Sequence, residues 1–190
     1  MYNNCMEKEV KTMIEDINGF RLPRYTQIPD VGLYLEQVVR YVNAHLALLG
    51  EPELTSSMVS NYVKQGLIPS PIKKAYTAEH LARLLFIAVV KPVVPLEGLR
   101  LMFGIQEDNY PLQTAYDYFC DEFENMLGAA FGISPARDRI GKTQSDAKDL
   151  LRNTILATVN KVYLDRYLED YQKQRKNEMH SEKREPARGI

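Results

Sequence analysis

Apolar residues recur at helical spacing along almost the whole chain of 190 residues, and glycines and prolines interrupt them at short intervals. Strand-like alternation is confined to a short segment near Ile72. This pattern predicts an all-α fold of helices joined by turns. A hydrophobic content of 45% is enough to build the core of one compact domain, or of a small head with an oligomerising segment.

Residues 1–30 are predicted to hold a short helix and a connector. Apolar residues over 6–18 repeat with helical spacing, and Gly19 follows where a C-terminal cap is expected. The remainder contains two prolines and little periodicity, which predicts an extended segment laid over a surface. Asp30 is then expected to cap a helix over about 33–49.

Residues 31–104 are predicted to form a compact head of short helices joined by tight turns. Cap residues mark the expected ends of these helices, because Ser, Thr and Asp favour the N-terminus and Gly favours the C-terminus. After the first helix, the expected elements are Thr55 or Ser56 to Gln65 closed by Gly66, Ala78 to Lys91 capped by Thr77, and Leu96 to Phe103 ended by Gly104.

Residues 105–171 differ in character and are predicted to form a helical dimerisation or effector region. A long helix is expected over 112–131, with the acidic side chains mostly on its outer side, and a last helix over about 144–171. The apolar face of that last helix is too broad for one partner, which predicts burial on two sides, against the helix over 112–131 and against a second copy of the chain. The charged tail, 172–190, lacks apolar periodicity and is expected to be disordered.

The segment 55–91 carries the residues that point to a function. An Asn side chain can bond bidentately to adenine, Ser reaches base edges or phosphates, and Lys contacts phosphate or guanine. A solvated helix face is the alternative for these polar residues. The positions not used for packing on the helix from Thr55 to Gln65 are Ser56, Ser57, Ser60, Asn61 and Lys64.

Charge supports the DNA hypothesis locally, although the net charge of the whole chain is only −1. The segment 55–91 has five cations against one carboxylate, Glu79, a local excess of four positive charges. Such an excess is the electrostatic footprint of a phosphate-binding surface. The five cations are Lys64, Lys73, Lys74, Arg83 and Lys91.

This segment resembles the head of the MerR superfamily, in which a Tyr precedes Gly-Leu-Leu-x-Pro, a wing ends in a basic-x-Tyr, and Leu-x-x-Leu-x-x-Ile follows. The resemblance implies a winged helix-turn-helix with a short wing, in which Lys73 and Lys74 bind phosphate and Tyr76 is half core and half phosphate contact. The matching residues are Tyr62, Gly66, Leu67, Ile68, Pro69, Lys74, Tyr76, Leu81, Leu84, Ile87 and Leu96.

A closer resemblance is to the domain-of-unknown-function family numbered eighteen thirty-six, through the segments 28–38, 54–76 and 80–87. The sequence departs from the MerR pattern at the adjacent Arg and Tyr that MerR proteins present to DNA, which are Ser60 and Asn61 here. The link that would form the wing is also several residues shorter than usual. Recognition is therefore expected to depend more on Asn61, Lys64, Lys73 and Lys74.

No constellation of an enzyme is present in the sequence. The carboxylates between Glu107 and Glu124 have no neighbouring nucleophile, and a phosphate-cradling Gly-rich loop is missing. Cys120 is interpreted as a buried core thiol, and His45 and His80 as structural residues without metal spacing. No cofactor or metal is therefore predicted, and the chain is not expected to be an enzyme.

The sequence leads to two hypotheses. The first is a sequence-specific transcriptional regulator that binds double-stranded DNA as a homodimer, with any small-molecule effector unidentified. The second is a protein-interaction adaptor that keeps the helix-turn-helix scaffold and binds a partner through the acidic, aromatic segment 107–131. The cytoplasm is the expected compartment, because the apolar run over 81–90 is too short to cross a membrane.

Overall fold

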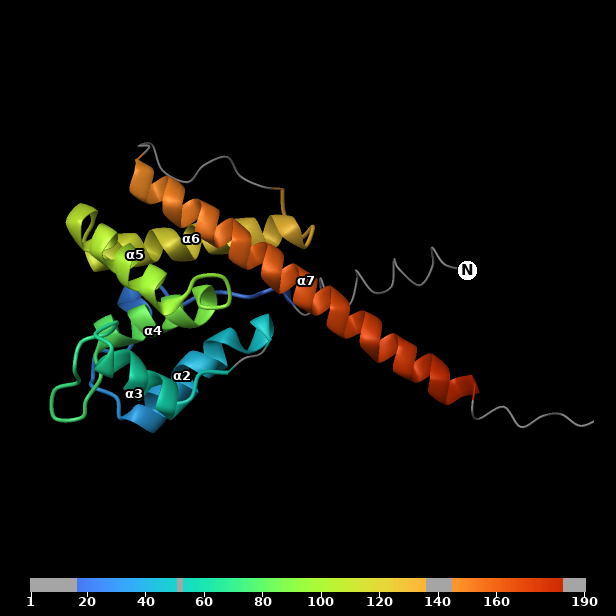
Figure 1. Ribbon diagram of the computed structural model, residues 1–190, viewed down its shortest axis with the longest axis horizontal. Coiled ribbons are helices and arrows are strands. Elements are labelled where there is room, and N and C mark those ends of the chain that lie inside the picture. The colour runs from blue at the N-terminus through green and yellow to red at the C-terminus, as the bar shows by residue number, and fades with distance from the viewer. Residues whose placement is uncertain (1–16, 51–52, 136–144, 183–190) are drawn as a thin grey trace, which may run out of the picture.

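The computed structural model describes residues 17–50, 53–135 and 145–182, with side chains placed as far as residue 177. Within these ranges the chain is all-helical and contains no strand (Figure 1), as the periodicity predicts. The helix expected over 6–18 lies almost wholly outside the described residues. The helices are α2 (Leu35–Leu46), α3 (Ser56–Lys64), α4 (Ala78–Val90), α5 (Leu96–Asn109), α6 (Leu112–Ala130) and α7 (Asp146–Glu182), with single 3-10 turns at Tyr25–Gln27 and Ala47–Leu49.

Helix α4 forms the centre of the core. It is apolar on nearly every side, and a helix of that composition is stable only when other elements surround it. Helices α2, α6 and α7 pack against it. The capping prediction for Thr77 is confirmed, because its backbone N–H donates to Nδ1 of His80 at 3.0 Å and so closes the first turn.

The N-terminal connector lies over a surface, as predicted, and that surface is α6. Phe20 and Leu22 are buried, and the ring of Phe20 meets that of Phe123 edge-on, with centroids 5.9 Å apart. The expectation for Asp30 is wrong, because its carboxylate accepts from the backbone N–H of Ala78, at the start of α4, rather than capping α2. The pairing of Leu33 with Tyr76 brings Asp30 to the N-terminus of α4 before α2 begins.

Two helices are longer than predicted. Gly104 does not end α5, which continues to Asn109; an ion pair of 2.8 Å between Glu107 and Arg83 of α4 holds the additional turn. Helix α7 continues to Glu182, so the expectation of a disordered tail is wrong for residues 172–182. Those residues are good helix formers, and pairs one turn apart, such as Asp170 and Lys173, stabilise polar helices.

Helices α6 and α7 pack side by side along much of α6. The prediction that Glu122 lies on the outer side of α6 is wrong: its side chain is fully buried and faces Arg152 of α7, with 3.1 Å between carboxylate and guanidinium. A buried carboxylate is tolerated where a cation compensates it. This pair ties α7 to α6 at their interface.

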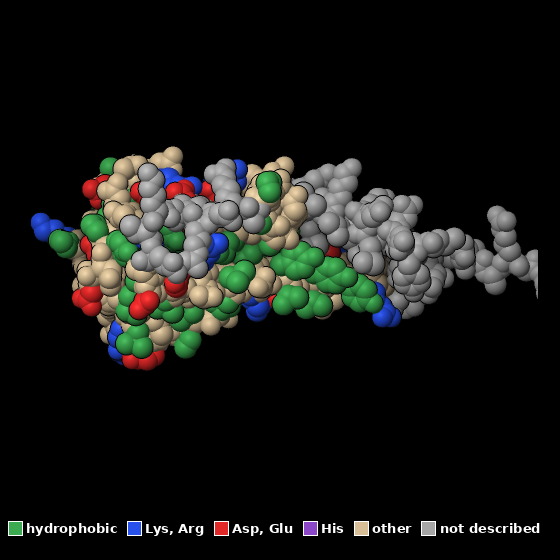
Figure 2. Space-filling view, turned by 90° about the horizontal axis from the view of Figure 1, so that it is seen from above, with side chains coloured by type: hydrophobic (Ala, Val, Ile, Leu, Met, Phe, Trp, Pro, Cys, Tyr) green, Lys and Arg blue, Asp and Glu red, His purple; other side chains and the backbone are tan. Residues whose placement is uncertain are grey.

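The outer part of α7 projects away from the other helices (Figure 1). Hydrophobic side chains gather along it (Figure 2), and Leu164, Leu168 and Tyr171 follow one another at one-turn spacing, each about half exposed. Within the described ranges, no helix has the length and apolar character needed to span a membrane.

Candidate nucleic-acid interface

Helix α3 begins and ends where its cap residues predict. The Thr55 hydroxyl accepts from the backbone N–H of Met58 at 3.3 Å. At the other end Gly66 has φ of 70°, and the N–H groups of Gly66 and Leu67 donate to the carbonyls of Val63 and Tyr62. This pair of bonds is a Schellman motif, which requires the left-handed conformation that glycine adopts without strain.

The outer face of α3 is polar. Ser57, Asn61 and Lys64 are exposed and stand one turn apart, on the side opposite the buried Val59 and Tyr62. Such a stripe is the part of a helix that can reach base edges in a major groove. The structure therefore brings together the residues that the sequence predicts for this surface.

Two of the polar side chains already bond within α3. The Ser60 hydroxyl donates to the carbonyl of Ser56 at 2.9 Å, and Oδ1 of Asn61 accepts from the side chain of Gln65 at 3.2 Å. The Asn61 amide nitrogen still offers two hydrogens to a partner. Ser56, which is only half exposed, contributes less surface than Ser57.

The predicted wing is a tight turn with two lysines at its tip. The N–H of Ala75 donates to the carbonyl of Ile72 at 2.9 Å, and the two residues between them, Lys73 and Lys74, have φ of 50° and 66°. Positive φ at both central positions is the signature of a type I′ turn, which favours Asn and Gly rather than Lys. Both lysine side chains are exposed.

Pairing with the segment before α2 anchors this turn. Leu33 and Tyr76 exchange two backbone hydrogen bonds of 2.8 and 2.9 Å. Tyr76 is only 5% exposed, its ring packs edge-on against His80, and burial raises the pKa of its hydroxyl. It therefore belongs to the core, and the structure gives no support to the predicted phosphate contact of Tyr76.

The distribution of charge differs from the sequence count at one position. Arg83 is buried and pairs with Glu79 and Glu107, so it adds nothing to the exposed footprint. Lys64, Lys73 and Lys74 take part in none of the ion pairs between described residues. These three exposed ammonium groups remain available to an anionic partner.

Arg100 is a residue of this surface that the sequence did not indicate. It lies on α5, but its guanidinium donates to the carbonyl of Gln65 at 2.7 Å, at the C-terminal end of α3. A cation there is favourable because the helix dipole is negative at that end. Since 35 residues separate the two partners, no local pattern could have revealed the contact.

The acidic side chains of segment 107–131 are largely used inside the molecule. Glu124 accepts from the backbone N–H of Leu22 at 2.8 Å and pairs with Arg24 at 2.7 Å, which raises the pKa of that guanidinium. Asp121 also pairs with Arg24, and Asp117 accepts from the N–H of Tyr25. These carboxylates hold the N-terminal connector on α6.

Cys120 matches its interpretation as a core residue. Its thiol is buried, burial raises its pKa to about 12, and the thiol points at the carbonyl of Pro23. A thiol of this kind stays protonated and is a poor nucleophile and metal ligand. Among the described residues, no group of three or more His, Cys, Asp or Glu could hold a metal ion.

The profile of one protein family matches this chain. That family is described as Domain of unknown function (DUF1836), and the match covers residues 23–119, half of the chain. It extends from the N-terminal connector through the head into α6. No curated protein and no solved structure matches the chain.

Proposed function

We propose that this chain, which belongs to the DUF1836 family, is a sequence-specific DNA-binding transcriptional regulator that acts as a homodimer. The observation that carries the proposal is the surface formed by the exposed face of α3 and the lysine turn that follows it. In Figure 1 that turn projects beside α3, at the end of the molecule away from the outer part of α7. The turn that bears Lys73 and Lys74 therefore lies close to the helix that bears Asn61 and Lys64.

The arrangement supports a winged helix-turn-helix of the MerR type. Helix α2 packs against α3, so α3 would be the recognition helix and the turn at Lys73 and Lys74 the wing. Asn61 would read a base edge through its amide, and Lys64 and the two wing lysines would contact phosphates on either side of the groove. The sequence resemblance to MerR heads supports the same assignment.

A homodimer would place two copies of α3 in successive major grooves of a pseudo-palindromic site. Support comes from the outer part of α7, where Leu164, Leu168 and Tyr171 form an apolar stripe at one-turn spacing. Such a stripe on a helix is the seam used between paired helices. A second copy of α7 presents the same stripe, as a two-fold interface requires.

The proposal is tested by selecting DNA from a random library with the full chain, then measuring affinity by fluorescence anisotropy at several salt concentrations. We expect an enriched site with two related halves and an affinity that falls steeply with salt. Lys64→Ala together with Lys73→Ala should weaken binding at every salt concentration. Absence of binding even at low salt, or unchanged binding by the double variant, would refute the proposal.

The adaptor hypothesis gains less support from the geometry. Its acidic segment was expected to bind a partner protein, but Asp117, Asp121 and Glu124 hold the N-terminal connector, and Glu122 is buried. The same experiment distinguishes the two functions. A stoichiometric protein partner recovered by pull-down, with no DNA enriched, would favour the adaptor.

A further inference from the structure

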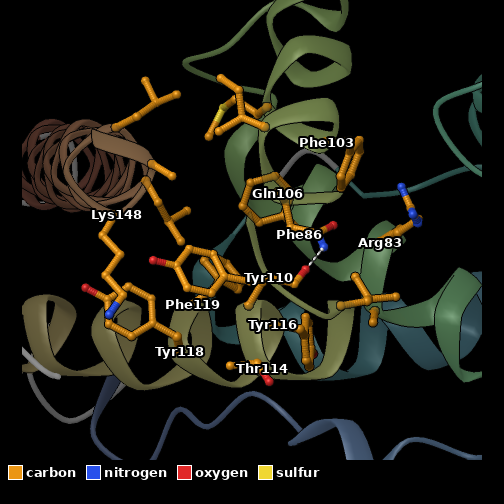
Figure 3. A pocket seen from close by; sticks show the side chains of 18 residues that line it. Arg83, Phe86, Phe103, Gln106, Tyr110, Thr114, Tyr116, Tyr118, Phe119 and Lys148 are labelled. Atoms are coloured by element: carbon orange, nitrogen blue, oxygen red, sulfur yellow. Dashed lines mark hydrogen bonds between the residues drawn. The ribbon is translucent and has the colours of Figure 1, made fainter. Parts of the chain in front are cut away.

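A cavity of about 160 Å³ lies where α4, α5, α6 and α7 meet (Figure 3). Each of the four helices contributes to its wall, which is made mainly of aromatic and aliphatic side chains. Phe86 comes from α4, Met102 from α5, Phe119 from α6 and Leu151 from α7. An apolar cavity of about 150 Å³ holds one benzene ring, so this one has room for a single aromatic ring.

Gln106 in this wall has an acceptor with unused hydrogen-bonding capacity. The Gln106 amide nitrogen donates to the carbonyl of Tyr110 at 2.7 Å, the dashed line in Figure 3. That bond fixes the orientation of the amide, and Oε1 of Gln106 is buried without a hydrogen-bond partner in the described part of the chain. Since a buried acceptor has lost its water, a ligand that brings a donor to this oxygen would restore the missing bond.

The groups around the cavity disfavour a cationic ligand. Two cations, Arg83 and Lys148, line it, and no carboxylate from the described residues does. The Lys148 ammonium lies over the rings of Tyr110 and Tyr118, at 5.6 and 5.5 Å from their centroids. A cationic ligand would find the faces of Tyr110 and Tyr118 already occupied by the Lys148 ammonium.

We propose that this cavity binds a small neutral phenol, with the aromatic ring between the four helices and the hydroxyl donating to Oε1 of Gln106. The ring fits the volume, the hydroxyl donor fits the unpaired oxygen of Gln106, and a neutral ligand does not need the aromatic faces that Lys148 already occupies. The inference concerns ligand binding alone and does not require the head to bind DNA.

The first test uses the full chain with 13C-methyl-labelled methionine, titrated with phenol and followed by NMR. Met102 lines the cavity, whereas Met126 lies on α6 away from it and serves as an internal control. We expect a saturable shift of the Met102 methyl with a Kd of about 1 mM or tighter, and no comparable shift of Met126. Failure of phenol to shift Met102 would overturn the proposal.

The second test isolates the hydroxyl by comparing phenol with fluorobenzene, which has nearly the same shape and no donor. The ratio of their Kd values should change about tenfold against phenol in the shape-preserving variant Gln106→Met, because only phenol loses a bond. An unchanged ratio in a folded variant would overturn the assignment. If the variant does not fold, the wild-type protein decides the matter. The affinity of phenol relative to that of fluorobenzene must then be about tenfold higher than the ratio of their partition coefficients from water into cyclohexane, where no hydrogen bond can form.

The third test addresses charge, with benzylamine as a cationic probe of similar size. We expect benzylamine to leave the Met102 methyl unshifted at concentrations that saturate phenol. Binding of benzylamine as tight as that of phenol would overturn the preference for a neutral ligand. DNA affinity measured in the same samples is a separate readout, so failure of the regulator proposal would leave this result interpretable.

Discussion

The turn at Lys73 and Lys74, the proposed wing, allows its structural role and its proposed binding role to be separated, because one double substitution should change the two in opposite directions. Lys73 and Lys74 both have positive φ, a conformation that costs a non-glycine residue about 1–2 kcal/mol. Lys73→Asn together with Lys74→Gly introduces the pair that a type I′ turn prefers. Part of the gain is lost because glycine is more flexible in the unfolded chain, by about 0.5–1 kcal/mol.

The net effect on folding is therefore a stabilisation of about 1 kcal/mol, which raises Tm by roughly 2–4 °C in a chain of this size. The effect on DNA binding has the opposite sign. Each lost phosphate contact makes the negative slope of log K against log salt less steep by about 0.9. Removing both lysines should reduce the steepness of that slope by about 1.8 for each head.

Differential scanning calorimetry measures the first quantity, and anisotropy titrations on a selected DNA site measure the second. The matched control is Arg175→Gln together with Lys176→Gln, which removes the same charge from the outer part of α7, far from α3 (Figure 1). We expect the control to leave the slope unchanged. A wing variant that is destabilised would refute the turn geometry, and one that keeps the wild-type slope would refute the phosphate contacts.

Three further predictions concern the dimer, the connector and pH. Leu164→Glu with Leu168→Glu should convert a dimer into a monomer in light scattering, whereas Leu101→Glu, at an exposed leucine of α5, should not; a dimer surviving the double change places the interface elsewhere. Glu124→Ala should lower the free energy of unfolding by about 2–3 kcal/mol in urea, since it releases the connector; no loss would contradict that role. Burial lowers the pKa of His80, so the unfolded chain binds this proton more readily, and stability should fall as pH drops below about 6.5. A His80→Gln variant should flatten that part of the Tm profile, and an unaltered profile would show that other groups cause it.

The sequence correctly predicts the ends of those helices that are fixed by contacts between residues close together in the sequence. Thr55, Gly66 and Thr77 cap their helices through bonds to residues three to five positions away. Such bonds depend on spacing alone, so a cap residue beside an apolar repeat is sufficient to locate them. The polar face of α3 follows for the same reason, since the buried residues fix which side remains outside.

The sequence fails where a distant partner decides the outcome. Gly104 would end an isolated helix, but the bond of Glu107 with Arg83 extends α5 beyond it. Glu122 resembles its acidic neighbours and differs only because Arg152 of α7 compensates it. The wing conformation is also not local: Lys73 and Lys74 disfavour positive φ, and pairing on either side of them imposes it.

If the head binds DNA as proposed, the exposure of its cations limits how strongly charge can contribute to the affinity. Burial removes Arg83 from the five cations of the sequence count, and the contact with α3 adds Arg100, so each head presents five cations near α3: Lys64, Lys73, Lys74, Lys91 and Arg100. If every one met a phosphate, a dimer would neutralise about ten phosphates, and the salt slope could reach roughly −9. A shallower slope fits a head that also reads bases through neutral groups such as Asn61. A steeper slope would require cations outside this surface and would contradict the assignment of α3 and its wing as the whole interface.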